Sequence, residues 1–197
     1  MRFFKIALIG ALLGIATACT RSPSPSQSAA TAQLVATKST ANSNFQLTSD
    51  AFKSGEPIPS LYTCDGGNVS PPLSWSGEPQ KTVTFAVIVD DPDAPAGVFT
   101  HWVLFNLPAD IHNLPQGVPN TETLDNGAVQ GQNSGGKIGY TGPCPPQGTH
   151  RYRFFLYALD TSLNLKPDVS KQKVQDAMQG NILGQAQILG TYQRTGR

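Results

Sequence analysis

The sequence is poor in charge, and the charges that it has are scattered. Charged residues make up 14% of the 197 residues, the net charge is +1, and no run of basic residues is longer than two. Electrostatic binding of nucleic acid needs a basic patch, so the sequence argues against a nucleic-acid partner. It also lacks Gly-x-Ser-x-Gly, zincin and phosphate-loop motifs, which removes the common signatures of hydrolases and nucleotide-binding proteins.

A hydrophobic run long enough to cross a membrane is missing from the amino-terminal region. The apolar stretch from Ile6 to Ala16 has eleven residues, fewer than the roughly 20 that a spanning helix needs. It follows the basic residues Arg2 and Lys5 and leads through small residues into Cys19, which resembles a bacterial lipobox with Ala16 in the usual leucine position. We therefore expect residues 1–18 to be a lipoprotein-type signal peptide and Cys19 to be acylated. The alternative is an ordinary secretory signal with Cys19 incidental.

Either signal implies export, and lipidation would make the chain a membrane-anchored lipoprotein of the bacterial cell envelope. Residues 19–44 are rich in Ser, Thr, Ala, Pro and Gln, with almost no large apolar side chains. Such a segment buries too little surface to offset its ordering entropy, so we expect a flexible linker. The folded domain is expected over 45–197.

Cysteine is scarce, and no close-spaced pair such as Cys-x-x-Cys occurs among the 3 cysteines. With Cys19 lipidated, Cys64 and Cys144 are the only pair available to an oxidising compartment, and we expect a disulfide between them. Two free thiols, a reactive Cys144, or a zinc site with nearby histidines are the alternatives, the last weakened by the ligand spacing. We predict no metal and no cofactor.

The 19 glycines and 16 prolines indicate short strands and many turns. Strands are expected at 81–89, 100–107 and 151–159, the last apolar on both faces and hence central in its sheet. The connection from Pro115 to Gly136 is unusually long for a compact domain unless it packs down or shapes a site.

One helix is expected late in the chain. Ser170 is its cap, and Val174, Ala177, Met178 and Ile182 follow at helical spacing. After Gly184 the pattern returns to period two, which predicts a closing strand over 185–192. Many strands and one late helix indicate a mainly antiparallel β domain.

Two segments combine rigid loops with groups that could converge on a polar cavity. Residues 91–95 read Asp-Pro-Asp-Ala-Pro and are followed by His101, and residues 142–152 read Gly-Pro-Cys-Pro-Pro-Gln-Gly-Thr-His-Arg-Tyr. These two segments resemble the signature regions of the phosphatidylethanolamine-binding protein family, in particular its bacterial, Raf-kinase-inhibitor-like branch. The similarity extends from about Phe45 to Arg194.

The resemblance implies an antiparallel β-sandwich of the phosphatidylethanolamine-binding-protein type, with one or two short helices near the C-terminus. It also implies a small pocket for phosphate-like groups, including phospholipid head groups, at one end of the sandwich. Cys144 departs from the glycine of the animal branch but suits bacterial members, where Cys64 often accompanies it. The implied pocket positions are Asp91, Asp93, Pro95, His101, Trp102 or its neighbourhood, Pro146, His150 and Tyr152.

The chemistry of these residues fits an anionic ligand. Imidazoles of His101 and His150 and the hydroxyl of Tyr152 are possible donors, and Asp91 makes sense if it accepts a hydrogen bond from an imidazole. Each residue also has an ordinary structural interpretation: Asp-Pro sequences favour turns, and Arg151 could either enter the pocket or pair with a carboxylate elsewhere. His112 is assigned to a surface loop.

Three functions follow from these observations. The first is a non-enzymatic binding protein for a small anionic or phosphorylated ligand, held at the membrane through Cys19. The second is an inhibitor or interaction module acting on a protein of the envelope. The third is a Cys/His hydrolase, which would need Cys144 as a free thiol beside a base.

Overall fold

The computed structural model describes residues 44–194. The expected signal peptide, the acylation of Cys19 and the linker up to residue 43 therefore lie outside the described residues. Within the described part, no helix is both long and apolar enough to cross a membrane.

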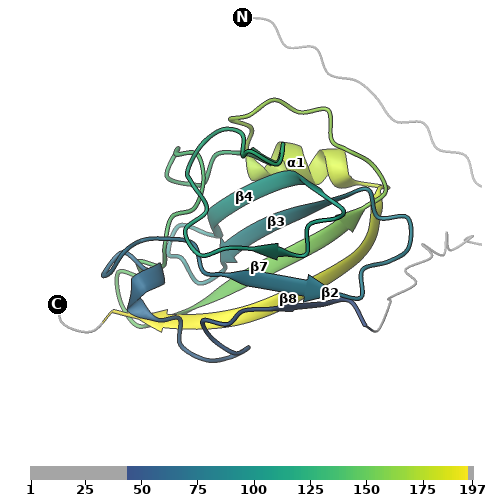
Figure 1. Ribbon diagram of the computed structural model, residues 1–197. Helices are drawn as coiled ribbons and strands as arrows, with labels where there is room; N and C mark the ends of the chain where they lie inside the picture. Colours follow the sequence, from purple (N-terminus) through teal and green to yellow (C-terminus); the bar gives the residue numbers. More distant parts are fainter. Residues whose placement is uncertain (1–43, 195–197) are drawn as a thin grey trace, which may run out of the picture. The chain divides into compact units, whose positions relative to one another are not determined.

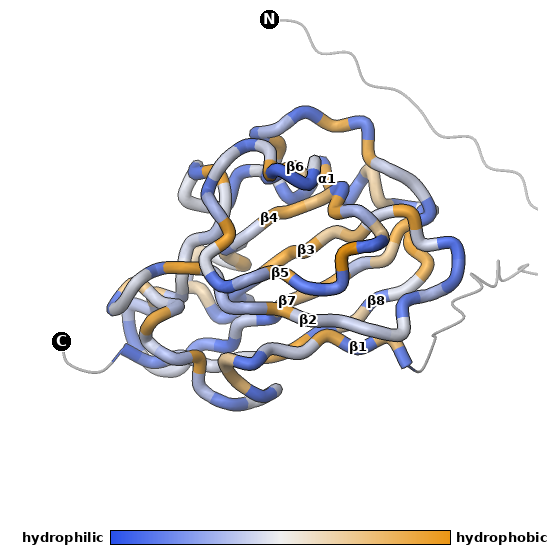
Figure 2. Tube along the Cα trace, viewed as in Figure 1, coloured by the Kyte–Doolittle hydropathy of each residue, from blue (hydrophilic) through white to orange (hydrophobic). Residues whose placement is uncertain are grey.

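The main element of the fold is an antiparallel sheet of five strands in the order β6-β4-β3-β7-β8. Its strands are β3 (Thr84–Asp91), β4 (Phe99–Pro108), β6 (Val129–Gln130), β7 (Thr149–Leu159) and β8 (Ile182–Gln193). A second antiparallel sheet, of order β1-β2-β5, contains β1 (Gln46–Thr48), β2 (Leu73–Ser76) and β5 (Asn113–Leu114). Figure 1 shows β2 lying across one face of the large sheet, and Figure 2 adds β1 and β5 on that face.

Both faces of the large sheet are covered. One face packs against the small sheet through Phe85, Trp75 and Leu156, among others. The other face, which includes Ile88 and Val103, is covered by α1 (Lys171–Met178) and the chain around it. All eight residues of β3 are buried, which explains why its residues 85–89 form a continuous apolar run rather than an alternating pattern.

The expected strands are present, with shifted ends. The strand expected to be central, β7, lies between β3 and β8, and its alternate residues enter the two separate cores. The mainly β, antiparallel sandwich is thus confirmed. Besides α1, the described residues contain a single turn of 3-10 helix, η1 (Ser60–Tyr62).

The helix prediction is right at its start and wrong at its end. The Ser170 side chain accepts a hydrogen bond from the backbone N–H of Lys173, as a helix N-cap does. Val174 and Met178 are buried as expected, but Ile182 belongs to β8. The chain leaves the helix at Gly180, which has a φ of +81° that glycine adopts without steric cost.

Candidate functional site

A cavity of about 250 Å³ lies where three strands of the large sheet end and one loop covers them. The C-terminal end of β3 provides Asp91, and the starts of β4 and β7 provide His101 and His150. Strands β4 and β7 are both antiparallel neighbours of β3, so these strand ends meet at one edge of the sheet. The cavity is lined by Asp91, Ala94, Pro95, Phe99, His101, Thr141, Gly142, Cys144, Pro145, Pro146 and His150.

A β-bulge directs His101 into this cavity. Opposite β3, Trp102 pairs with Val89 and Thr100 pairs with Asp90, so His101 is an extra residue without a partner of its own. Simple alternation would place His101 and Trp102 on opposite faces of the sheet. The bulge breaks that alternation, as bulges near functional sites often do.

His101 is buried and held in a defined tautomer. Its Nδ1 lies 2.7 Å from the carbonyl oxygen of Thr141, and because a carbonyl only accepts, Nδ1 carries the proton. Burial lowers the pKa of His101, although the Thr141 carbonyl and the Asp91 carboxylate oppose the effect. The neutral ring then leaves Nε2 as a hydrogen-bond acceptor for a ligand.

Asp91 and His150 form a buried pair beside His101. The Nδ1 of His150 donates to Oδ2 of Asp91 over 2.7 Å, and the two side chains are only 8% and 5% exposed. The other carboxylate oxygen accepts the backbone N–H of Asp93 at 2.8 Å. The expected hydrogen bond between Asp91 and an imidazole is therefore present, and it fixes the tautomer of His150 so that Nε2 is available.

Asp93 is the candidate residue whose surroundings differ most from expectation. Both of its oxygens bind Arg151, with Nη2 at 2.6 Å and Nε at 2.8 Å, and the Arg151 backbone N–H donates at 2.9 Å. Arg151 holds the pKa of Asp93 well below its usual range. Asp93 does not line the cavity; it fastens the loop after β3 to β7 and lines an open hollow of about 660 Å³ beside it. A ligand contact for Asp93 stays a prediction.

Two aromatic candidates lie behind the cavity rather than in its wall. Tyr152 contacts the ring of His101 edge-on, with the ring centres 5.2 Å apart. Its buried hydroxyl makes no hydrogen bond of good geometry to the described residues, although the Asp91 carboxylate lies close enough to affect its ionisation. Burial, with the negative charge of Asp91, raises the pKa of Tyr152. Trp102 is fully buried in the core and donates to Gln130, so it is not a pocket residue.

A disulfide between Cys64 and Cys144 holds the covering loop, with Cα atoms 5.4 Å apart. Next to it the Cys64 backbone N–H donates to the Pro143 carbonyl at 3.0 Å. The loop passes so close to Tyr62 that a Cβ at Gly142 would come within 2.5 Å of the Tyr62 carbonyl oxygen. Only glycine fits this approach.

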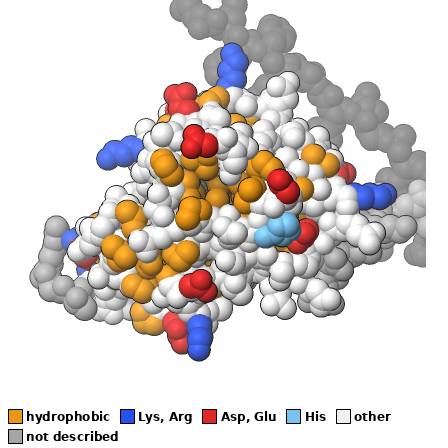
Figure 3. All heavy atoms as spheres, viewed as in Figure 1, with side chains coloured by type: hydrophobic (Ala, Val, Ile, Leu, Met, Phe, Trp, Pro, Cys, Tyr) orange, Lys and Arg blue, Asp and Glu red, His pale blue; other side chains and the backbone are white. Residues whose placement is uncertain are grey.

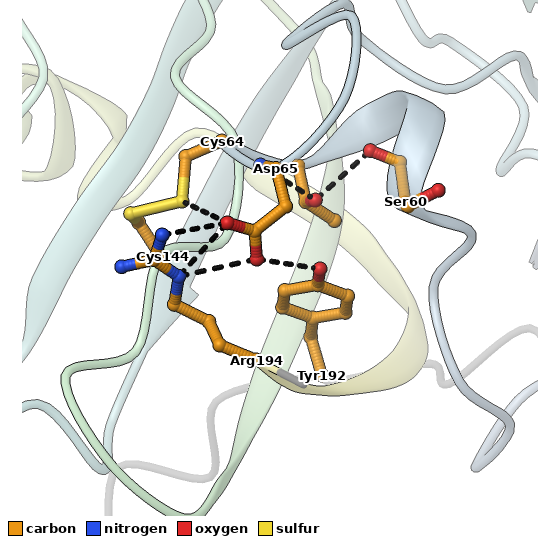
Figure 4. Close-up of polar contacts among 7 residues, drawn as sticks. Ser60, Cys64, Asp65, Cys144, Tyr192 and Arg194 are labelled. Carbon is orange, nitrogen blue, oxygen red and sulfur yellow. Dashed lines mark hydrogen bonds and ion pairs between the residues drawn. A yellow bond between two sulfur atoms is a disulfide. The ribbon is translucent and has the colours of Figure 1, made fainter. Parts of the chain in front are cut away.

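The same end of the molecule carries a polar cluster around Asp65, drawn in Figure 4. Arg194 binds Asp65 with Nη2 at 2.6 Å, and the Tyr192 hydroxyl donates to it at 2.8 Å. This cluster fastens the end of β8 to the segment that carries Cys64. Nothing in the spacing of these residues along the sequence indicated the contact.

Comparison with known proteins identifies the family. The model of the family described as phosphatidylethanolamine-binding protein matches residues 48–193. The chain belongs to the phosphatidylethanolamine-binding protein family.

Relatives from distant organisms agree with this assignment. A UPF0098 protein of Methanothermobacter thermautotrophicus is 54% identical over 148 residues, covering 75% of this chain and 98% of the relative. A UPF0098 protein of Aquifex aeolicus is 45% identical over 152 residues, covering 76% and 88%.

Two solved structures share the fold. A phosphatidylethanolamine-binding protein homologue from Chlamydia trachomatis has a TM-score of 0.71 and 42% identity, covering 77% of this chain and 98% of its own. YbcL from E. coli, described as a new member of the mammalian family, has a TM-score of 0.73 and 37% identity, covering 77% and 99%.

In this phosphatidylethanolamine-binding protein family member, the structure brings five of the seven candidate ligand residues to the cavity wall. They are Asp91, Pro95, His101, Pro146 and His150. Sequence reasoning missed Phe99 and Thr141, whose contributions are an aromatic wall and a backbone carbonyl. Across residues 44–194, no three His, Cys, Asp or Glu side chains are grouped as metal ligands would be.

Proposed function

We propose that this chain is a non-enzymatic binding protein whose cavity holds a small, singly charged anionic group, such as the phosphate of a phospholipid head group. The observation that carries the proposal is the pair His101 and His150. The Nδ1 atom of each ring is already engaged, so that Nε2 of each ring is left for a ligand. A phosphate group matches two imidazoles in two ways: a protonated ring donates through Nε2 to any phosphate oxygen, and a neutral ring accepts through Nε2 from the P–OH of inorganic phosphate or a monoester. A phosphodiester such as a phospholipid head group has no P–OH, so its binding requires that at least one of the two rings take up a proton.

The charges around the cavity support a singly charged ligand. The lining residues include the carboxylate of Asp91 but neither lysine nor arginine. Bringing a multiply charged anion beside a carboxylate without a permanent cation would cost electrostatic energy. The proline-rich walls, including Pro95 and Pro146, are already ordered, so binding loses little conformational entropy.

Titration calorimetry with glycerophosphoethanolamine and with inorganic phosphate tests the proposal. We expect His101→Ala to weaken binding by about ten- to a hundredfold, as loss of a charge-assisted hydrogen bond does. His112→Ala is the matched control, because His112 is exposed and pairs with Glu78 outside the cavity. Equal affinity of His101→Ala and the wild type, with both proteins folded by circular dichroism, would refute the assignment.

The absence of catalysis is part of the proposal, and it is supported by the bonding of Cys144. Its sulfur is joined to Cys64, whereas a nucleophilic cysteine must be a free thiolate. Release of p-nitrophenol from its phosphate or acetate ester, lost in His150→Ala, would contradict this part.

We also propose that the chain is exported and anchored through a lipid on Cys19. The support is the lipobox-like sequence before Cys19 together with the Cys64–Cys144 disulfide, since disulfides persist mainly in oxidising compartments. Labelled palmitate should be incorporated into the wild type and not into Cys19→Ser. Equal labelling of both proteins would place the lipid on another residue, and an absence of label in both would refute the lipid anchor.

A further inference from the structure

The long connection between β4 and β6 forms a second hollow, of about 560 Å³, that shares no lining residue with the cavity at Asp91. It lies beside β5, the edge strand of the small sheet. Its volume is within the range of pockets that hold small organic molecules. We call it the β5 groove; it is lined by Asp110, Ile111, His112, Asn113, Leu114, Pro115, Val118, Pro119, Thr121, Thr123, Leu124, Asp125 and Asn126.

The walls of the β5 groove are held in place by a buried glutamine. The side-chain N–H groups of Gln130 donate to the carbonyls of Pro119 and Thr121, both at 2.7 Å. Its oxygen accepts the indole N–H of Trp102 at 2.7 Å. Gln130 is fully buried, so this clamp couples the connection to the core and preorganises the groove.

The floor of the β5 groove is the outer surface of the main core. Leu114 and Val118 are core residues, and Ile111 and Leu124 are partly buried against them. Figure 3 shows hydrophobic side chains gathered in a hollow on the face that carries β2 and β5. An apolar ligand part placed there would remove this surface from water, a favourable change.

The rim of the β5 groove is acidic. Asp110 and Asp125 line it, and neither carboxylate makes an ion pair within residues 44–194. The sequence contains no lysine or arginine between positions 82 and 136, and in Figure 3 acidic side chains border the hollow while basic ones lie farther out. His112, the other ionisable lining residue, is paired with Glu78 at 2.9 Å.

We propose that the β5 groove is a second ligand site, for a small amphiphilic cation in which an apolar chain or ring carries an ammonium group. The apolar part would lie on Ile111 and Leu124, and the ammonium group would lie at the acidic rim that Asp110 and Asp125 provide. The site is independent of the anion cavity in residues, charge and ligand.

Titration of the wild-type protein with octylammonium, kept below its critical micelle concentration, tests the proposal. Binding is monitored in ¹H–¹⁵N correlation spectra. We expect saturable shifts at the amides of residues 110–126, stronger binding than for 1-octanol, and little binding of octanoate. Ethylammonium, which has the charge without the apolar chain, should bind at least tenfold more weakly. The assignment would be overturned if octanoate bound as tightly as octylammonium, or if the shifts were centred on Asp91 and His101.

Substitutions on the rim test the charge. The double variant D110N/D125N should weaken octylammonium binding about two- to thirtyfold, the range for two exposed charge pairs. The control D50N/D160N makes the same change in net charge at two exposed residues outside the groove and should bind like the wild type. If both double variants bind octylammonium with the same affinity, whether unchanged or weakened relative to the wild type, the rim has no specific role.

Discussion

Removing the Cys64–Cys144 disulfide should destabilise the domain by an amount that the chain length between the cysteines sets. The separation of 80 positions gives a loss of denatured-state entropy equivalent to about 4.5 kcal/mol at 25 °C. This is an upper value, because typical disulfides contribute about 2–4 kcal/mol. For a domain of roughly 150 residues, each kcal/mol lowers Tm by about 2–4 °C, so the double variant C64S/C144S should melt about 4–18 °C below the wild type.

The assay is thermal unfolding followed by circular dichroism, with the wild type measured oxidised and after reduction. The variant and the reduced wild type should agree, because both lack the same constraint. The hydrogen bond from Cys64 to Pro143 and the Arg194–Asp65 pair remain, so we expect a folded protein at 25 °C. A fall in Tm of less than 2 °C would refute the reasoning, since it would mean that the bond does not lower the entropy of the unfolded chain by the expected amount.

Three further substitutions test the candidate site. Tyr152→Phe should change the free energy of unfolding by less than about 1 kcal/mol in urea denaturation, because the removed hydroxyl is buried without a hydrogen bond of good geometry; a larger loss would reveal a hidden bond. Asp91→Asn should cost about 1.5–3 kcal/mol in the same assay, because it replaces two hydrogen bonds to a carboxylate with bonds to an amide, which can serve both partners only if His150 moves its proton from Nδ1 to Nε2. An unchanged stability would contradict the pairing of Asp91 with His150. Burial lowers the pKa of His101, so the unfolded chain takes up its proton first: the contribution to stability is complete above about pH 6.5 and declines as the pH falls below it. His101→Gln should therefore show a smaller fall in Tm from pH 7.5 to 5.5 than the wild type, and equal falls would exclude His101 as the cause.

The sequence predicted the elements whose pattern is local. Strand β7 could be placed in the sheet interior because both of its faces are apolar, and the Ser170 cap could be read from its position before a helical repeat. Ile182 continued that repeat in the sequence, but Gly180 turned the chain before it was reached. The spacing of apolar residues alone does not show where a helix ends.

The candidate site was predictable in its members and less so in its geometry. Asp91, His101 and His150 meet as the two motifs indicated. The bulge at His101 arises from the register between β3 and β4. It could not be predicted from the sequence of either strand alone. The sequence allowed Arg151 to pair with a carboxylate but did not identify Asp93 as the partner; the start of β7 brings the guanidinium onto the loop that carries Asp93.

Asp90 and Asp91 illustrate why adjacent identical residues acquire different roles. Asp90 faces the α1 side, where its carboxylate binds Lys171 at 3.0 Å and the Thr100 hydroxyl at 2.8 Å. Asp91, one residue later, faces the cavity and binds His150. Each buried carboxylate is satisfied by its own partners, as burial of charge requires, so the strand end places one acid in the cavity wall while the other ties the sheet to the helix.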